Sequence, residues 1–198
     1  MGSIYDFKPK FQGLLRPLAN TLAQRGWTAN QVTLLALVIS IFTGLLAYLL
    51  GGKYPGIFWL LPIVLFIRMA LNAIDGMLAR EHQMQSKLGG ILNEVGDVIS
   101  DSALYLPFVV VSGLWQPLVI TSVILAILTE FVGILGQVVG DLRRYDGPLG
   151  KSDRAFLYGL TAIFVTQGLG HFWLNLIFIV GIVLLVLTIW NRAKKSLQ

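Results

Sequence analysis

Long stretches without a charged side chain limit most strongly what this chain can fold into. Residues 26–52 form a run of 27 residues without Asp, Glu, Lys or Arg, and residues 155–191 form a run of 37. About 20 predominantly apolar residues in a helix cross the hydrocarbon core of a bilayer. Only 13% of the 198 residues are charged, against about 25% in an ordinary soluble domain. The sequence therefore predicts an integral membrane protein and excludes a soluble globule, a secreted mini-protein and a disordered chain.

The apolar stretches and the turn residues between them predict six transmembrane helices. The expected spans lie at about residues 30–50, 55–79, 88–112 and 118–140, and residues 155–191 hold two more, separated at 167–171. We therefore expect an all-α membrane domain over residues 29–198. The chain has no cysteine, which excludes a disulfide framework, a thiolate metal site and a cysteine nucleophile.

Residues 1–28 differ from the rest of the chain. Apolar side chains recur at helical spacing from Ile4 to Leu22, with Lys8, Lys10 and Arg16 among them. An apolar stripe beside a basic face is typical of a helix that lies in the membrane interface. We expect an interfacial amphipathic helix here; the alternative is a linker whose periodicity is accidental.

The positive charges orient the expected helices. Of the 15 Lys and Arg residues, 13 lie at the chain ends or in the loops on one side of the membrane, whereas Lys53 lies alone on the other side and Arg68 lies inside a span. The positive-inside rule places both termini in the cytoplasm. The net charge of +5 thus belongs to a cytoplasmic rim and not to a face that binds nucleic acid.

Polar side chains recur every three or four residues within the expected second and third spans, so each span has one polar face. A charged group at the bilayer centre costs about 2.5–3.5 kcal/mol even on lenient insertion scales, so such faces need a compensating partner. The second span carries Arg68, Asn72, Asp75, Gly76 and Ala79 on this face, and the third carries Gly89, Asn93, Asp97 and Asp101.

A hairpin that turns at Met84 brings the two polar faces together at matched depths. Asp75 and Asn93 are each nine residues from Met84. Asn72 is twelve residues from it and Asp97 is thirteen. Oxygen-bearing side chains that converge from two facing helices suit a hard cation such as Mg²⁺ or Mn²⁺. A buried polar network that fixes helix packing, with the arginine of the second span as a partner, accounts for the same residues equally well.

The same residues resemble the motif of the CDP-alcohol phosphatidyltransferase family. The family pattern is D-x-x-D-G-x-x-A-R, about eight residues, and then G-x-x-x-D-x-x-x-D. Here residues 72–80 read NAIDGMLAR and residues 89–97 read GGILNEVGD, with eight residues between them. Residues 28–33, TANQVT, are similar to the T-P-N-x-x-T that often opens the first span of these enzymes.

The resemblance implies a six-helix transferase in the bacterial inner membrane, with its active site facing the cytoplasm. Such an enzyme moves a phosphatidyl group from CDP-diacylglycerol to the hydroxyl of a small polar alcohol and releases CMP, in phospholipid biosynthesis. The resemblance also implies one or two Mg²⁺ or Mn²⁺ ions and a homodimer. The lipid bilayer is then the surrounding partner, and nucleic acid is not a partner.

Carried over by position, the resemblance gives each motif residue a role. Asp75 becomes a metal ligand, and Asn72 and Asn93 become neutral ligands where the family has carboxylates. Asp97 becomes the general base or a further metal ligand. Because two formal charges are lost, we expect weaker metal binding, with one well-held ion in place of two. The residues expected to lie against the CDP-lipid are Gly76, Ala79, Arg80 and Gly89, although tight helix packing and a positive-inside anchor would also account for them.

A basic cluster precedes the expected fifth span. Gly150 and Lys151 stand before a helix N-terminus, where backbone N–H groups and basic side chains form an anion site. Family members that use phosphorylated acceptors often have Gly-Lys here, which favours glycerol 3-phosphate or an inositol phosphate as the acceptor. A cytoplasmic loop is basic on topological grounds alone, which is the alternative. The residues expected to bind the acceptor are Arg143, Arg144, Lys151 and Arg154.

Two other functions fit parts of the sequence. The loss of two motif carboxylates is compatible with a catalytically degenerate relative that binds CDP-lipid or a partner without transfer. Intramembrane charges also occur in small-solute transporters. Against a transporter, the sequence has no inverted repeat, and its polar face ends near Asp101, short of the outer surface. The sequence assigns no role to Asp101, Glu94 or Glu130.

Overall fold

The structure is a computed structural model that describes residues 8–140 and 142–198. The first part of the expected interfacial helix, with Ile4 and Phe7, lies outside these residues. The elements are α1 (Lys8–Gln24), α2 (Ala29–Leu50), the 3₁₀ segment η2 (Pro55–Trp59), α3 (Leu60–Glu81), α4 (Lys87–Tyr105), the 3₁₀ segment η3 (Leu106–Val110), α5 (Gln116–Val139), α6 (Lys151–Thr166) and α7 (His171–Ser196).

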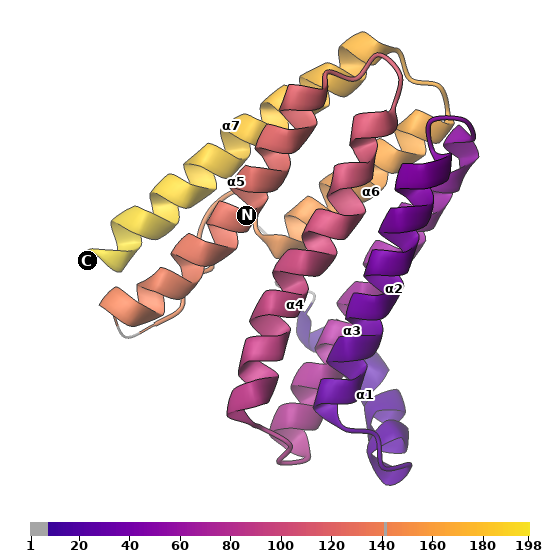
Figure 1. Cartoon of the computed structure of the whole chain (residues 1–198). Coiled ribbons are helices and arrows are strands. Elements are labelled where there is room, and N and C mark those ends of the chain that lie inside the picture. Colours follow the sequence, from indigo (N-terminus) through magenta and orange to yellow (C-terminus); the bar gives the residue numbers. More distant parts are fainter. Residues whose placement is uncertain (1–7, 141) are drawn as a thin grey trace.

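From α2 onward, helices of the described chain run alternately up and down, and each corresponds to one expected span (Figure 1). Four are long and apolar enough to cross a membrane: Ala29–Leu50, Pro55–Glu81, Gln116–Val139 and His171–Ser196. Helix α4 is less apolar because it carries Glu94, Asp97 and Asp101, and α6 has only 16 residues. The third span was expected to continue as one helix to residue 112, but α4 ends at Tyr105 and a 3₁₀ segment that contains Pro107 follows.

Side-chain caps fix where α2 and α4 begin. Thr28 and Gln31 form a capping box at the start of α2, in which the Gln31 backbone N–H donates to Thr28 Oγ1 at 3.3 Å and the Thr28 N–H donates to Gln31 Oε1 at 2.9 Å. Ser86 Oγ accepts the Gly89 N–H at 2.9 Å at the start of α4. The caps thus fix where along the chain each helix begins. Figure 1 shows that both helices begin at the same end of the bundle, near the α3–α4 loop.

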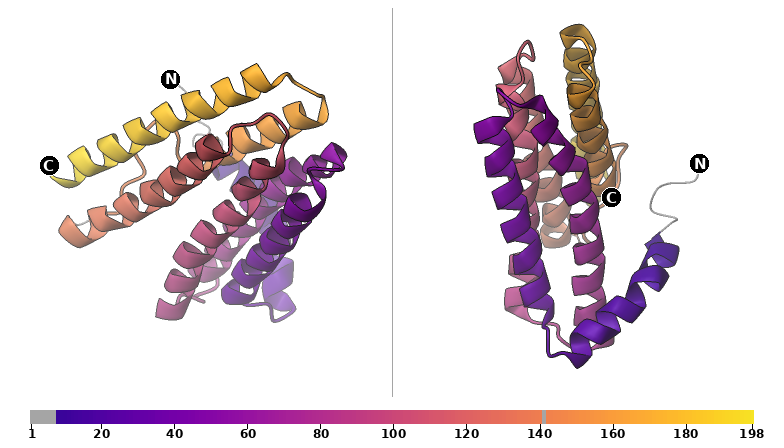
Figure 2. Two further views of the ribbon diagram at one scale, coloured as in Figure 1. Left: turned by 45° about the horizontal axis from the view of Figure 1, so that its top comes forward. Right: turned by 90° about the vertical axis from the view of Figure 1, so that its right-hand side faces the viewer.

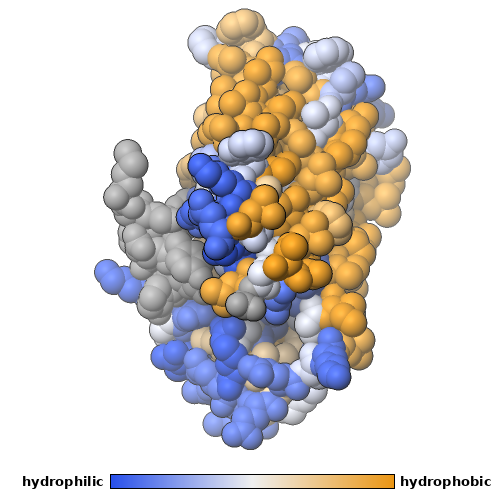
Figure 3. Space-filling model, turned by 90° about the vertical axis from the view of Figure 1, so that its left-hand side faces the viewer, coloured by the Kyte–Doolittle hydropathy of each residue, from blue (hydrophilic) through white to orange (hydrophobic). Residues whose placement is uncertain are grey.

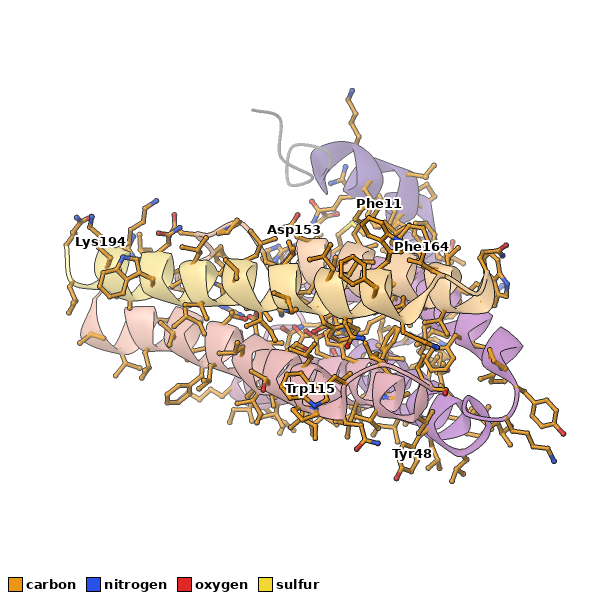
Figure 4. The ribbon with its side chains drawn as sticks, turned by 90° about the horizontal axis from the view of Figure 1, so that it is seen from above. Phe11, Tyr48, Trp115, Asp153, Phe164 and Lys194 are labelled. Carbon is orange, nitrogen blue, oxygen red and sulfur yellow. The ribbon has the colours of Figure 1, made fainter. Side chains whose placement is uncertain are left out.

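The helices pack as two groups that α6 joins. Helices α2, α3 and α4 form one group, and α5 lies beside α7 in the other (Figures 1 and 2). In the first group, α2 and α4 meet so closely that a Cβ on Gly44 would overlap the carbonyl oxygen of Ala103. Tyr158 of α6 stacks on Tyr105 of α4, with ring centroids 3.8 Å apart. Viewed from above, Lys194 marks the far end of α7, away from the first group (Figure 4).

The outer surface of the bundle is apolar. Figure 3 shows apolar side chains over the upper part of one face and hydrophilic side chains gathered toward its lower end. Exposed apolar area of this extent is rare on soluble monomers and marks contact with a membrane or partner. The surface agrees with the integral membrane protein that the sequence predicts. Large exposed apolar residues include Phe42, Leu45, Leu49, Phe66, Phe131, Val183 and Trp190.

Helix α1 lies obliquely at the end of the bundle that carries the α3–α4 loop (Figure 2). Its buried Ala19 packs in a cluster with Leu78 of α3. Arg16 donates to both carboxylate oxygens of Glu81, at 3.0 and 3.1 Å. Leu14 remains exposed. Residues Lys8–Gln24 therefore form an α-helix, with one apolar edge packed on α3 and another left uncovered by the described chain.

Candidate active site

Two hydrogen bonds between α3 and α4 join the motif residues in the pairs that the folded hairpin predicts. Asn72 Nδ2 donates to Asp97 Oδ1 at 3.0 Å, and Asn93 Nδ2 donates to Asp75 Oδ2 at 3.5 Å. Both carboxylates are buried and both amides are half-buried. The matched depths expected about Met84 are thus confirmed for these four side chains.

A third helix orients Asp75. Thr33 of α2 donates its Oγ1 hydroxyl to Asp75 Oδ2 at 2.8 Å. The other oxygen, Asp75 Oδ1, receives no side-chain hydrogen bond from the described residues. Sequence reasoning did not assign Thr33 to the site. The sequence feature that could have indicated Thr33 is the segment TANQVT, of which it is the last residue. Thr33 lies one helical turn after the start of α2.

Asp97 is held by cations on both of its carboxylate oxygens. Arg68 Nη2 contacts Asp97 Oδ1 at 3.2 Å, beside the hydrogen bond from Asn72. Lys151, the first residue of α6, makes an ion pair with Asp97 Oδ2. The chain therefore neutralises Asp97 with its own side chains, and Lys151, which was expected to contact the acceptor phosphate, lies beside Asp97.

Behind Asp97, a buried network of alternating charges connects α3 to α7. Asp101 lies between Arg68, which pairs with its Oδ1, and Arg154, whose Nη2 is 2.9 Å from its Oδ2. Arg154 also contacts Glu130 at 2.8 Å and donates to Thr129 Oγ1 at 2.9 Å. Arg154 was expected to bind the acceptor, but the structure places it fully buried among these partners.

Glu130 of α5 is the centre of three arginines. Arg143 lies 3.0 Å, Arg154 2.8 Å and Arg192 3.5 Å from its carboxylate oxygens. Arg143 also makes an ion pair with Glu94 of α4. The sequence did not predict a role for Arg192 in this network. A basic residue that follows a long apolar run is expected at the cytoplasmic rim, so its position in the sequence gives no sign that it is buried.

The four residues expected to bind the acceptor therefore lie in three different surroundings. Lys151 and Arg143 keep partial contact with solvent and pair with carboxylates of α4. Arg154 is buried behind them. Arg144 packs along α5, where its backbone N–H donates to Gly133 O at 3.0 Å, and it pairs with none of the acidic residues that the structure describes.

The residues expected to meet the CDP-lipid also differ in their surroundings. A Cβ on Gly76 would meet only the guanidinium of Arg80, 3.1 Å away, so α3 is open at this point apart from one exposed, flexible side chain. Ala79 is half-buried on the same helix. A Cβ on Gly89 would lie 2.7 Å from Asn30 Oδ1, so close packing of α4 on α2 already accounts for this glycine.

The oxygen atoms that remain without a side-chain donor are of the kind that a hard cation binds. Within residues 8–140 and 142–198, no three His, Cys, Asp or Glu side chains group as a metal site. Asp75 Oδ1 and the amide oxygens of Asn72 and Asn93 receive no side-chain hydrogen bond from the described chain. One carboxylate and neutral oxygens, completed by water and substrate phosphates, suit Mg²⁺ or a similar ion. Asp97 contributes less to such a site because Lys151 and Arg68 already neutralise it.

Residues 27–190 match the family described as CDP-alcohol phosphatidyltransferase, and the chain belongs to this family. It is 50% identical over 198 residues to the inner membrane protein YnbA of Escherichia coli strain K12, a match that covers 98% of this chain and 96% of that protein. An archaetidylinositol phosphate synthase of Pyrococcus horikoshii is 33% identical over 97 residues, 49% of this chain and 48% of its own length. A phosphatidylinositol phosphate synthase of Mycobacterium marinum is 28% identical over 124 residues, 62% of this chain and 51% of its own length.

The fold is shared with solved structures of this class. The phosphatidylinositol phosphate synthase of Mycobacterium tuberculosis with CDP-DAG bound superposes with a TM-score of 0.74 at 21% identity, covering 91% of this chain and 92% of that chain. The same enzyme in complex with manganese and citrate gives a TM-score of 0.75 at 21% identity, covering 92% and 88%. These likenesses show the fold of the protein.

Proposed function

We propose that this protein transfers a phosphatidyl group from CDP-diacylglycerol to the hydroxyl of a small phosphorylated alcohol, such as glycerol 3-phosphate or an inositol phosphate, with release of CMP. The observation that carries the proposal is the pairing of Asp75 and Asp97 with the two motif asparagines across α3 and α4. The family supports the reaction type. Relatives named as inositol phosphate synthases support a phosphorylated acceptor.

We also propose six membrane spans over residues 29–198, with α1 in the cytoplasmic interface and both termini in the cytoplasm of a bacterial cell. Thirteen of the 15 basic residues would then lie on the cytoplasmic side. The oblique position of α1 and its uncovered Leu14 support an interfacial helix. Two copies would associate as the family resemblance implies.

CDP-diacylglycerol would enter sideways from the cytoplasmic leaflet with its acyl chains remaining in lipid. Its cytidine and pyrophosphate would lie against α3 at Gly76 and Ala79, where Arg80 can neutralise phosphate charge. Asp75, with the amide oxygens of Asn72 and Asn93, would hold a Mg²⁺ or Mn²⁺ ion that, when bound, neutralises pyrophosphate charge.

Asp97 is the proposed general base. The acceptor hydroxyl oxygen forms a bond to the phosphorus that carries the diacylglycerol, and its proton passes to Asp97. The bond from that phosphorus to CMP breaks, and CMP leaves with the electron pair. Lys151 and Arg143 bind the acceptor phosphate, and Arg144 lies in the same loop. Arg154 is buried and is proposed as a positioning residue. It pairs with Asp101, the partner of Arg68, and with Glu130, the partner of Arg143.

An acceptor panel tests the proposal. Purified protein in phosphatidylcholine nanodiscs receives CDP-diacylglycerol, Mg²⁺ or Mn²⁺, and one of glycerol 3-phosphate, inositol phosphate, glycerol, inositol or serine. We expect metal-dependent CMP release with a phosphorylated acceptor, and a lipid product whose mass contains that acceptor. No CMP with any acceptor would support the second candidate, a relative that binds CDP-lipid without transfer, which the neutralised Asp97 and the two motif asparagines favour.

Restoring the two motif carboxylates is expected to strengthen metal binding. In the double variant Asn72→Asp and Asn93→Asp, two more anionic ligands face the cation, and ligand charge is a principal determinant of such affinities. We expect Mn²⁺ to bind at least about tenfold more tightly, measured by electron paramagnetic resonance titration without substrate. Gln137→Glu, an exposed position on α5, should leave Mn²⁺ affinity unchanged. Equal affinity in the double variant and the unmodified protein would contradict the placement of the metal.

A further inference from the structure

Two cations at the edge of the candidate site are each paired with a carboxylate of α4. Glu94 and Asp97 are three residues apart, so they lie on neighbouring positions of one helix face. Glu94 pairs with Arg143 of the α5–α6 loop, and Asp97 pairs with Lys151 at the start of α6. The acidic face of α4 therefore holds both cations at once.

These two pairs are the accessible part of the charge network. The side chains of Lys151, Glu94 and Arg143 are 32%, 29% and 18% exposed, whereas those of Arg154 and Arg192 are 0% and 2% exposed. A solute that arrives from water therefore meets Lys151 and Arg143 first. Because Lys151 and Arg143 are the cations of the network that water reaches, an incoming anion can contact them directly.

A phosphate group is a stronger partner for both cations than the carboxylates. It carries up to two negative charges and three acceptor oxygens, so one phosphate can pair with both cations at once. Arg143 would also keep its orientation during an exchange. Its Nη2 stays 3.0 Å from the buried Glu130, while the partner of Nη1 is the more exposed Glu94.

We propose that Glu94 and Asp97 hold Arg143 and Lys151 in the place of the acceptor phosphate, and that a phosphorylated acceptor exchanges with both carboxylates. This rests on the proposed function for the identity of the phosphate as part of the acceptor. When Lys151 moves to the phosphate, its ion pair with Asp97 opens. Glu94 is then a specificity-determining residue, since an alcohol without a phosphate leaves both pairs intact.

Calorimetric titration with inorganic phosphate tests the exchange. The full chain in phosphatidylcholine nanodiscs is used without CDP-lipid or metal, so neither transfer nor metal binding contributes to the signal. We expect Glu94→Gln to bind phosphate about tenfold more tightly than the unmodified protein, because the competing carboxylate is gone. Lys151→Gln should bind about tenfold more weakly. Glu81→Gln removes the same charge from the exposed Arg16 pair and should leave phosphate affinity unchanged.

Glu94→Gln binding no more tightly than Glu81→Gln would overturn the proposal, as would an absence of phosphate binding in every variant. Glu94→Asp keeps the charge on a shorter side chain and should have an affinity between those of Glu94→Gln and the unmodified protein. The outcome is separate from that of the acceptor panel. Tighter phosphate binding without CMP release would retain the exchange and refute transfer, whereas transfer with unchanged phosphate binding would refute only the exchange.

Discussion

Replacement of Asp97 by asparagine is expected to lower the rate of CMP release by about 10²–10⁴-fold, the usual contribution of a general base. The amide has the shape of the carboxylate but cannot take the proton of the acceptor hydroxyl. CMP release is measured at saturating CDP-diacylglycerol with whichever acceptor the panel identifies. Asp146→Asn is the matched control, because Asp146 forms a more exposed pair with Lys195 outside the site.

Mn²⁺ binding by the same variant separates the two roles that the motif allows for Asp97. The two oxygens of Asp97 are already paired with Arg68 and Lys151, so Asp97→Asn should retain Mn²⁺ affinity within a few fold. Loss of both activity and Mn²⁺ binding would make Asp97 a metal ligand. Full activity in Asp97→Asn would eliminate it as the base.

Replacement of Arg154 by alanine is expected to destabilise the protein by about 3–5 kcal/mol, the cost of breaking a buried ion pair by removal of one partner. Arg154 is fully buried and contacts both Asp101 and Glu130, so its loss leaves two buried carboxylates short of a cation. The chain has five tryptophans, and their fluorescence can follow thermal unfolding in detergent.

An exposed ion pair provides the comparison for this prediction. Lys195→Ala breaks a pair whose lysine side chain is 52% exposed, and exposed pairs contribute only about 0–1 kcal/mol. Arg154→Lys keeps the charge but loses the planar fork that reaches two carboxylates and Thr129, so an intermediate midpoint is expected. Equal midpoints for Arg154→Ala and Lys195→Ala would show that the buried network does not stabilise the fold.

The parts of the site that sequence could predict are those fixed by a short loop. Helical periodicity and the turn near Met84 determine which residues of α3 and α4 share a depth, and both Asn–Asp pairs follow from this. The start of α2 was similarly predictable within one residue, because Thr28 caps it and a long apolar run follows.

The contacts that sequence could not predict join helices far apart in the chain. Thr33 and Asp75 are 42 residues apart and Asp101 and Arg154 are 53 apart, and neither pair lies within the α3–α4 hairpin, so no helical spacing relates them. Arg154 stands near a helix end, where the positive-inside rule accounts for any cation. Its burial depends on how α6 packs between the two helix groups, and only the tertiary arrangement determines this.

The order of residues along the chain has a consequence for how the interior is completed. All three arginines around Glu130 (Arg143, Arg154 and Arg192) follow it in the sequence. A chain that enters a bilayer from its N-terminal end therefore carries an uncompensated carboxylate on α5 until later segments arrive. Arg192 lies near the end of α7, the last helix. The final helices thus supply the counter-charges of an earlier one, and the interior becomes electrically balanced only when nearly the whole chain is in place.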